Sequence, residues 1–179
     1  AMIVDGRKLA RGVLKRVAGK VDELGRMPVV RILVQQPSAA TESYLRIKED
    51  KAEAVGIYLQ LIRLEDEATT QDLIDKIQLP EADSVIVQLP LPAHVDTEQV
   101  LSSIPVSLDA DVLSEAAYER FANNEEGALL PPVVGAIAEV LAHADVPLAG
   151  KRAVVVGNGR LVGQPAALWL ASQGVTVST

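Results

Sequence analysis

The stretch Ser84–Pro92, with the sequence SVIVQLPLP, decides the fold of this chain. It begins with a short β-branched, apolar run, which is typical of a strand buried on both faces in a parallel sheet. Its two prolines cannot donate a sheet hydrogen bond, so the strand must end near Gln88. The stretch therefore predicts a central strand over 84–88 with a polar side chain at its carboxyl end.

Apolar strands and amphipathic helices alternate on both sides of this stretch. Before it, the spacing of apolar residues predicts helices over 7–24, 42–55 and 69–77 and strands over 29–35 and 58–63. After it, we expect helices over 96–103, 133–142 and 161–173, strands over 153–156 and 175–178, and mixed loop and short helix over 105–130. This alternation is typical of βαβ units and indicates an α/β fold with a mostly parallel sheet.

The elements group into three parts. We expect an N-terminal three-layer αβα domain over 2–130, a connecting helix within 131–149, and the first βαβ part of a Rossmann-type domain over 150–179. One βα unit and the start of another strand cannot close a Rossmann sheet, so we expect the chain to be C-terminally truncated. Ala1 before Met2 is interpreted as the remnant of a tag.

The composition excludes several classes of function. A net charge of −7 argues against binding to the phosphate backbone of nucleic acids. The chain has no cysteine, which excludes disulfides and cysteine-bound zinc, and its two histidines lie far apart. Neither an apolar run of about 18 residues nor a leader peptide occurs, so we expect a cytoplasmic protein without a membrane partner.

Tyr44 and Lys48 are four residues apart and therefore share one face of the helix predicted over 42–55. Ala52 and Val55 continue that face. A lysine partly removed from water in this way is a usable proton acceptor, and a tyrosine can stack on a flat ligand. From position alone, however, the ordinary explanation is a lysine that extends along apolar neighbours with its ammonium group in solvent.

Polar side chains also follow strands at two other places. Gln88 ends its strand, and ligands of open α/β sheets bind at the carboxyl ends of strands. Asp109 and Asp111 lie in the segment Leu108–Val112, and a carboxylate can accept two N–H groups of a planar heterocycle. A solvent-facing glutamine and a solvated acidic loop are the ordinary explanations, and these residues alone favour them.

The segment Val156–Gly163, with the sequence VGNGRLVG, follows a predicted strand and opens a predicted helix. This is the context of a dinucleotide-binding turn, in which glycines let the backbone approach a pyrophosphate at a helix N-terminus. The spacing of the glycines is one residue longer than in the usual form. The acidic residue that binds the ribose would follow the next strand, beyond Thr179.

In order and spacing, these motifs resemble the bifunctional methylenetetrahydrofolate dehydrogenase/methenyltetrahydrofolate cyclohydrolase family. The family pattern is Tyr-x-x-x-Lys before Gly-Ile, then Val-Gln-Leu-Pro-Leu-Pro, Lys-Asp-Val-Asp-Gly, Pro-Cys-Thr-Pro-x-Gly and Val-Val-Gly-Arg-Ser-x-x-Val-Gly-x-Pro. The matching positions here are Tyr44 to Lys48 with Gly56-Ile57, Val87 to Pro92, Asp109 and Asp111, Gly135, and Val155 to Pro165.

The resemblance implies NAD(P)-dependent oxidation of 5,10-methylenetetrahydrofolate and hydrolysis of the methenyl product to 10-formyltetrahydrofolate, in one-carbon metabolism. It implies that Lys48 is the key hydrolytic residue, tuned by Gln88, while Tyr44 packs on the folate and Asp111 holds its pterin. Val87 and Leu89 would complete the folate site. NADP or NAD, without a metal, would be bound by Gly157, Asn158, Gly159, Arg160, Gly163 and Pro165. A homodimer formed through the cofactor domain is also implied.

The chain departs from the family pattern at three places. Leu108 and Val112 replace a lysine and a glycine, and Pro131-Pro132 stand in an altered Pro-Cys-Thr-Pro segment. Asn158-Gly159 replaces Arg-Ser, which removes a guanidinium suited to the NADP 2′-phosphate, although Arg160 follows. We therefore expect weakened NADP preference, with NAD or no dinucleotide as the options.

Two alternatives to an active folate enzyme stay open. The first is a diverged family member that lacks one or both activities and serves as a folate-binding or regulatory protein. The second is an unrelated nucleotide-binding α/β enzyme.

Overall fold

The computed structural model describes residues 3–179 and divides them into two compact units. One unit is Arg11–Ala116, and the other combines Ala117–Thr179 with the described residues up to Ala10. The expected domain boundary at residue 2, like the tag remnant, lies outside the described residues. Helix α1 (Gly6–Leu24) opens the chain and buries none of its residues.

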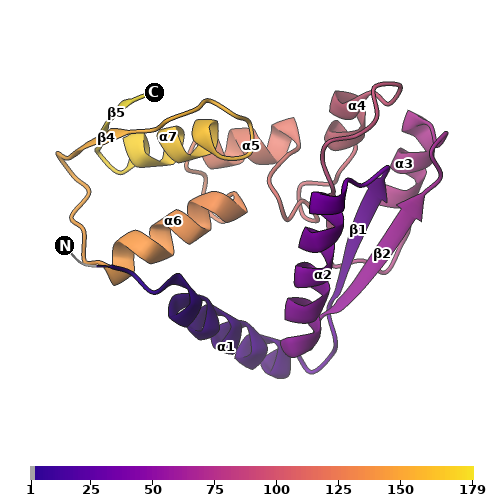
Figure 1. Cartoon of the computed structure of the whole chain (residues 1–179), viewed down its shortest axis with the longest axis horizontal. Helices are drawn as coiled ribbons and strands as arrows, with labels where there is room; N and C mark the ends of the chain where they lie inside the picture. Colours follow the sequence, from indigo (N-terminus) through magenta and orange to yellow (C-terminus); the bar gives the residue numbers. More distant parts are fainter. Residues whose placement is uncertain (1–2) are drawn as a thin grey trace. The chain divides into compact units, whose positions relative to one another are not determined.

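A three-stranded parallel sheet forms the centre of the unit Arg11–Ala116 (Figure 1). Its strands are β1 (Val29–Gln35), β2 (Tyr58–Leu64) and β3 (Ser84–Val87), in the order β2-β1-β3. In register, Leu33 of β1 lies between Ile62 of β2 and Val87 of β3. An isolated parallel bridge from Val85 to Asp109 extends the sheet past β3.

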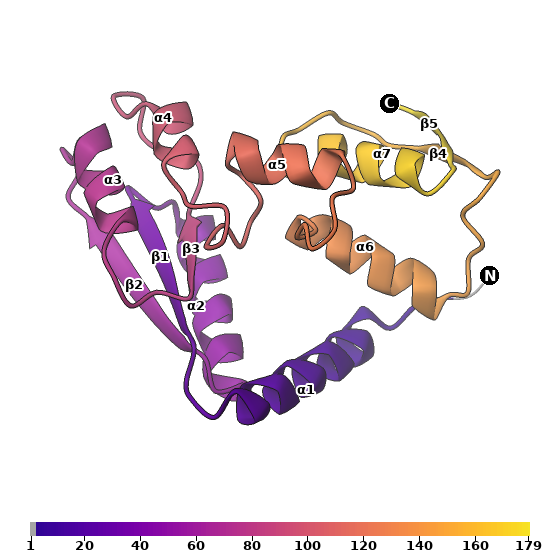
Figure 2. The ribbon, with the colours of Figure 1, turned by 180° about the vertical axis from the view of Figure 1, so that it is seen from behind.

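Helices cover both faces of this sheet, which confirms the predicted α/β fold with three layers (Figures 1 and 2). On one face, Ile32 and Val34 pack with Leu45 of α2 (Ala39–Ala54). On the other face, Leu33 packs with residues of α3 (Thr70–Ile77) and α4 (Thr97–Ser102). Successive residues of a strand point to opposite faces, so β1 alternately supplies both cores.

Helix α2 begins three residues earlier than predicted. Ser38 takes an extended backbone conformation, and its hydroxyl oxygen accepts a hydrogen bond from the Thr41 N–H. This side chain satisfies one of the four free N–H groups of the first turn, so it is the N-cap. Thr69 caps α3 in the same way, and the Asp72 carboxylate in turn accepts a hydrogen bond from the Thr69 N–H.

Two polar side chains are fully buried in β1, which the apolar strand pattern did not predict. Arg31 is 2% exposed and donates to Gln60 Oε1 at 2.7 Å, to the Leu79 carbonyl at 2.6 Å and to the Pro80 carbonyl at 2.7 Å. The two carbonyls belong to the chain just after α3, so the guanidinium satisfies acceptors near a helix C-terminus. Gln35 donates to three carbonyls of the 65–68 segment.

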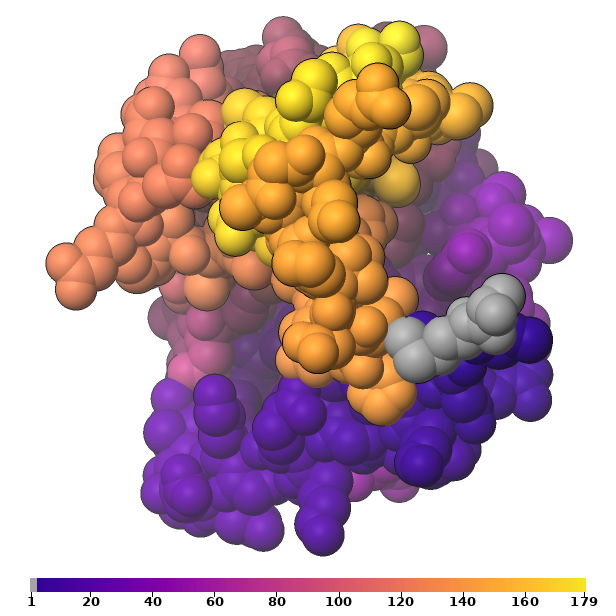
Figure 3. Space-filling view, turned by 90° about the vertical axis from the view of Figure 1, so that its left-hand side faces the viewer, coloured from indigo at the N-terminus to yellow at the C-terminus, as the bar shows by residue number. Residues whose placement is uncertain are grey.

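The second unit contains a two-stranded parallel sheet of β4 (Arg152–Val154) and β5 (Thr176–Ser178). Three helices accompany it: α5 (Glu115–Ala122), whose first residues belong to the other unit, α6 (Pro132–His143) and α7 (Gly163–Ser172). Figure 3 shows one face of the segment from α6 to β5, in orange to yellow. The short helix expected within 105–130 is therefore α5.

Two predicted elements of this unit were too long. Strand β4 ends at Val154 instead of residue 156, because its partner β5 ends at Ser178. Helix α7 begins at Gly163 instead of residue 161, because the preceding turn is closed by hydrogen bonds from the N–H groups of Val162 and Gln164 to the Gly159 carbonyl. Apart from the starts of α2 and α7 and the end of β4, the predicted boundaries agree with the structure within one residue.

Within the described residues, no helix combines the length and apolarity needed to cross a membrane.

Candidate functional site

Lys48 and Gln88 lie 40 residues apart in sequence and contact each other in the folded unit. The Lys48 Nζ donates to Gln88 Oε1 at 3.2 Å, and Gln88 Nε2 donates to the Leu89 carbonyl at 3.1 Å. The Gln88 N–H donates to the Leu33 carbonyl at 2.9 Å, which fixes the residue at the carboxyl end of β3. Both side chains are partly buried. The ordinary explanations, a lysine with its ammonium group in solvent and a glutamine that faces solvent, therefore do not describe this pair.

Asp111 is a third polar group near this pair, and its surroundings change its ionisation. Burial raises the pKa of the Asp111 carboxyl above its ordinary value. The charge of Lys48 opposes this rise, and the charge of Asp109 adds to it. Lys48, Gln88 and Asp111 thus come from a helix, a strand end and a loop, and Lys48 interacts with the other two, by a hydrogen bond to Gln88 and through its charge with Asp111.

Asp109 has a different environment from Asp111, although only one residue separates them. It is 1% exposed, and its carboxylate accepts hydrogen bonds from the N–H groups of Leu113 and Ser114. The explanation of this segment as a solvated acidic loop is therefore wrong for Asp109. The sequence does not show which of the two aspartates is bound by backbone N–H groups, because Asp109 and Asp111 fit the same pattern.

Val112 has the backbone conformation of a glycine. Its φ is +55°, in the left-handed region, and its side chain is 2% exposed. A β-branched residue rarely adopts this conformation, because its side chain crowds the neighbouring carbonyl. Val112 stands where the family pattern has glycine, the residue type that adopts such a conformation freely.

Tyr44 precedes Lys48 by one helical turn on α2 and is 65% exposed. Among residues 3–179, no aromatic ring packs on the ring of Tyr44, which leaves it available to a flat ligand. Val87 is buried in the core, so only its backbone is available to a ligand, whereas Leu89 is partly buried against the same core. Of the predicted folate-site residues, Lys48 and Gln88 contact each other, while Tyr44 stands apart at the surface.

The predicted cofactor turn forms a tight bend between β4 and α7. Gly157 has a φ of +97°, and a Cβ added at Gly163 would lie 2.0 Å from the Gly157 carbonyl oxygen. Only glycine fits at 163, since two stretches of backbone meet there. Pro165 is buried in the first turn of α7, where a missing N–H costs nothing. Asn158, Gly159 and Arg160 are exposed on the turn.

This turn fits a dinucleotide. A bend with little side chain followed by a helix N-terminus lets a pyrophosphate approach backbone N–H groups. Among residues 3–179, by contrast, no group of three or more histidine, cysteine, aspartate or glutamate residues is suited to a metal ion.

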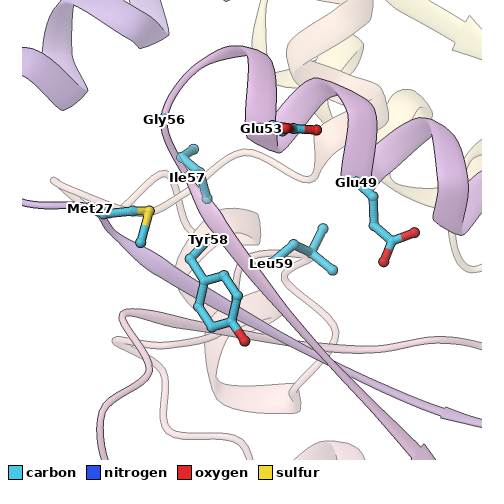
Figure 4. A pocket seen from close by; sticks show the side chains of 7 residues that line it. All are labelled: Met27, Glu49, Glu53, Gly56, Ile57, Tyr58 and Leu59. Carbon is cyan, nitrogen blue, oxygen red and sulfur yellow. The ribbon is translucent and has the colours of Figure 1, made fainter.

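A pocket of about 320 Å³ lies elsewhere in the unit Arg11–Ala116 (Figure 4). It is lined by Met27, Glu49, Glu53, Gly56, Ile57, Tyr58 and Leu59. Tyr58 begins β2, so the pocket lies at the amino ends of the strands, whereas Gln88 lies at a carboxyl end. Gly56 has a φ of +78° and turns the chain from α2 into β2. None of the residues predicted for the site lines this pocket.

Comparison with known proteins gives two domain matches along the chain. Residues 4–111 match the catalytic domain of tetrahydrofolate dehydrogenase/cyclohydrolase, and residues 131–179 match its NAD(P)-binding domain. The bifunctional protein FolD of Wolbachia sp. subsp. Drosophila simulans is 30% identical, over 99% of this chain and 63% of that protein. FolD of Lysinibacillus sphaericus is 30% identical over 98% of this chain and 64% of that protein.

Solved structures give the same result. The methylenetetrahydrofolate dehydrogenase-cyclohydrolase (FolD) of Trypanosoma brucei, complexed with NADP cofactor and inhibitor, has a TM-score of 0.92 and 30% identity. It is matched over 99% of this chain and 63% of that one. The FolD enzyme of Campylobacter jejuni has a TM-score of 0.91 and 26% identity, over 97% of this chain and 64% of that one. The chain thus spans slightly less than two thirds of the length of these relatives.

Proposed function

Because this chain belongs to the tetrahydrofolate dehydrogenase/cyclohydrolase family, we propose that its protein oxidises 5,10-methylenetetrahydrofolate and hydrolyses the 5,10-methenyl product to 10-formyltetrahydrofolate. The observation that carries this proposal is the Lys48–Gln88 hydrogen bond of 3.2 Å beside Asp111. It supplies a proton-transfer group at the carboxyl end of a parallel strand, where open α/β sheets bind ligands.

Lys48 would give the proton that the folate nitrogen gains during hydrolysis and take back the one that the attacking water loses. Water attacks the carbon that bridges the two folate nitrogens and loses a proton, and one nitrogen must regain a proton when its bond to that carbon breaks. An amine within hydrogen-bond reach can carry this proton between the two positions. Gln88 holds Nζ through its amide oxygen, which cannot ionise and so orients the amine without adding charge.

Asp111 and Tyr44 would hold the folate itself. An ionised carboxylate accepts two parallel N–H bonds, and a pterin offers an amino group and a ring N–H in that arrangement. Burial raises the pKa of Asp111, but Lys48 favours the ionised form that this contact needs. The exposed ring of Tyr44 would pack on the flat ring system, and backbone at Val87 and Leu89 would line the same site.

A nicotinamide dinucleotide, when bound, would accept the hydride from the methylene carbon. We infer that Gly157, Gly159 and Gly163 let its pyrophosphate approach the backbone, while Pro165 rigidifies the first turn of α7. Asn158 replaces the arginine of the family pattern, so the turn offers less charge to a 2′-phosphate, with Arg160 nearby. We infer weakened preference for NADP over NAD.

The remaining features follow from membership of the family. We infer a folate-binding domain over 2–130, a connecting helix within 131–149 and the first βαβ part of a Rossmann-type cofactor domain over 150–179. We also infer a cytoplasmic homodimer that acts in one-carbon metabolism without a metal, a membrane or a nucleic acid as partner.

A second candidate function is supported by Val112. A strained valine in place of glycine, next to Asp111, favours a diverged member that binds folate but has lost one or both activities. The substitutions at Leu108, Pro131 and Pro132 are further departures of the same kind.

One assay separates these two functions. The complete protein is mixed with 5,10-methylenetetrahydrofolate and either NAD or NADP, and the absorbance of the methenyl product is followed as it forms and decays. Formation and decay together support the bifunctional enzyme. Folate binding, measured by calorimetry, with only one of the two reactions or with neither would establish the diverged member instead. Tight and exclusive binding of NADP would contradict the inference drawn from Asn158.

A further inference from the structure

Asp109 is a buried carboxylate to which the proposed chemistry gives no part. Its Oδ2 accepts hydrogen bonds from the Leu113 N–H at 3.0 Å and the Ser114 N–H at 2.8 Å, and its Oδ1 lies 3.2 Å from the Leu113 N–H. Hydrogen bonds from backbone N–H groups to a carboxylate are among the stronger ones in proteins. The carboxylate therefore closes the loop 109–114 on itself.

The backbone of the same residue is attached to the sheet. Asp109 pairs with Val85 in a parallel bridge, and the Val85 N–H donates to the Leu108 carbonyl at 2.7 Å. The Ser84 hydroxyl donates to the same carbonyl at 3.0 Å. Because β3 also carries Gln88 at its end, one strand fixes both Gln88 and the start of this loop.

The closed loop contains the conformation that is least favourable for its residue type. Between Asp109 and Leu113, Val112 is held at a φ of +55°, where a β-branched side chain is crowded. A return of Val112 to negative φ would relieve this crowding, and the hydrogen bonds to Asp109, which join the two sides of the loop, oppose it. That movement would carry Asp111, which directly precedes Val112, out of its place.

We propose that Asp109 is a positioning residue, whose carboxylate clamps the loop 109–114 so that Asp111 is held beside Lys48 to receive the folate. This inference rests on the proposed function, in which Asp111 binds the pterin. In this proposal Asp109 makes no contact of its own with substrate or cofactor. Its contribution to folate binding passes entirely through Asp111, and this distinguishes it from a residue that only stabilises the fold.

A cycle of variants in the complete protein tests this dependence. Asp109→Asn keeps the side-chain shape but removes the charge, and we expect KM for the folate to rise by about tenfold, as for the loss of one charge-assisted hydrogen bond. Since the effect passes through Asp111, adding Asp109→Asn to Asp111→Asn should change KM by less than about twofold. If KM of the double variant instead rises by the product of the two single increases, the proposal is overturned.

A rescue experiment examines the loop directly. Val112→Gly removes the crowding that the clamp opposes, because glycine adopts positive φ freely. Combined with Asp109→Asn, it should recover most of the lost affinity, measured against Val112→Gly alone as the control. The absence of any recovery would contradict the proposed function of the clamp.

Hydrogen exchange separates failure of this inference from failure of the proposed function. In the ligand-free protein, the amides of Leu113 and Ser114 should exchange faster in Asp109→Asn than in the wild type, while circular dichroism shows an unchanged fold. Unchanged exchange would overturn the clamp, whatever the activity. If exchange rises but the wild-type protein neither binds nor converts folate, the proposed function fails, and with it the positioning of Asp111 for folate.

Discussion

Gly163 is the residue of the cofactor turn whose replacement should have the clearest effect. In Gly163→Ala, the new Cβ would lie 2.0 Å from the Gly157 carbonyl oxygen and 2.8 Å from its carbon, whereas ordinary contacts begin at 3.4 Å. Two backbone segments must therefore separate by about 1.4 Å, the difference between 3.4 and 2.0 Å. Neither can rotate away as a side chain would.

The loss of stability in Gly163→Ala can be estimated from the usual cost of overpacking. Forcing extra volume into a packed site costs about 1–3 kcal/mol, and alanine returns roughly 0.5–1 kcal/mol over glycine in a helix. We expect a net loss of about 1–2 kcal/mol in the free energy of unfolding. With a urea m-value of about 1–2 kcal/mol/M, the midpoint should fall by about 1 M.

The chain carries its own probe for this measurement. Trp169 is the single tryptophan, and it is buried on α7, the helix that Gly163 opens. Urea unfolding followed by its fluorescence therefore reports on the unit that is changed. Gly159→Ala is the matched control, because no atom lies within 4 Å of its added Cβ. Equal urea midpoints for Gly163→Ala and Gly159→Ala would contradict the predicted clash at Gly163.

Two further predictions concern the unit Arg11–Ala116. Arg31→Met leaves the carbonyls of Leu79 and Pro80 and the amide oxygen of Gln60 without their donor. The free energy of unfolding, measured with urea, should therefore fall by about 3 kcal/mol. Arg11→Met, on an exposed position of α1, is the control and should leave it almost unchanged. The hydrogen bond from Arg26 lowers the pKa of Asp83 from 3.8 to about 2, so its stabilising contribution is present above pH 3.8 and is lost as pH falls towards 2. The thermal midpoint of the wild type should fall more steeply over that interval than that of Asp83→Asn; parallel curves would show that the pair contributes nothing.

The strands and helices were predictable because their apolar residues recur at fixed intervals. The run Ser84–Val87 is β-branched and ends before prolines, and β3 occupies those residues. Helix starts were harder, since Ser38 and Thr41 both suit an N-cap and only the extended backbone at Ser38 decides between them. The burial of Arg31 was not predictable, because its partners Leu79 and Pro80 lie almost 50 residues away.

The sequence names candidate residues for the site but does not predict their contacts. Helical spacing paired Tyr44 with Lys48, yet the described hydrogen bond of Lys48 is to Gln88, from another element. Asp109 and Asp111 look equivalent in sequence, although one is clamped by backbone N–H groups and the other is coupled to Lys48. Folding determines which carboxylate remains available, and spacing along the chain does not contain that information.

The hydrolysis of 5,10-methenyltetrahydrofolate by the complete protein shows whether Lys48 transfers the proton. The decay of methenyl absorbance is compared in wild type, Lys48→Met and Lys51→Met, an exposed lysine near the end of the same helix. Loss of a general acid–base group typically costs about 10²–10⁴ in rate, so Lys48→Met should slow the decay by at least about 100-fold while Lys51→Met leaves it unchanged. Hydrolysis at the wild-type rate by a folded Lys48→Met protein would contradict the account.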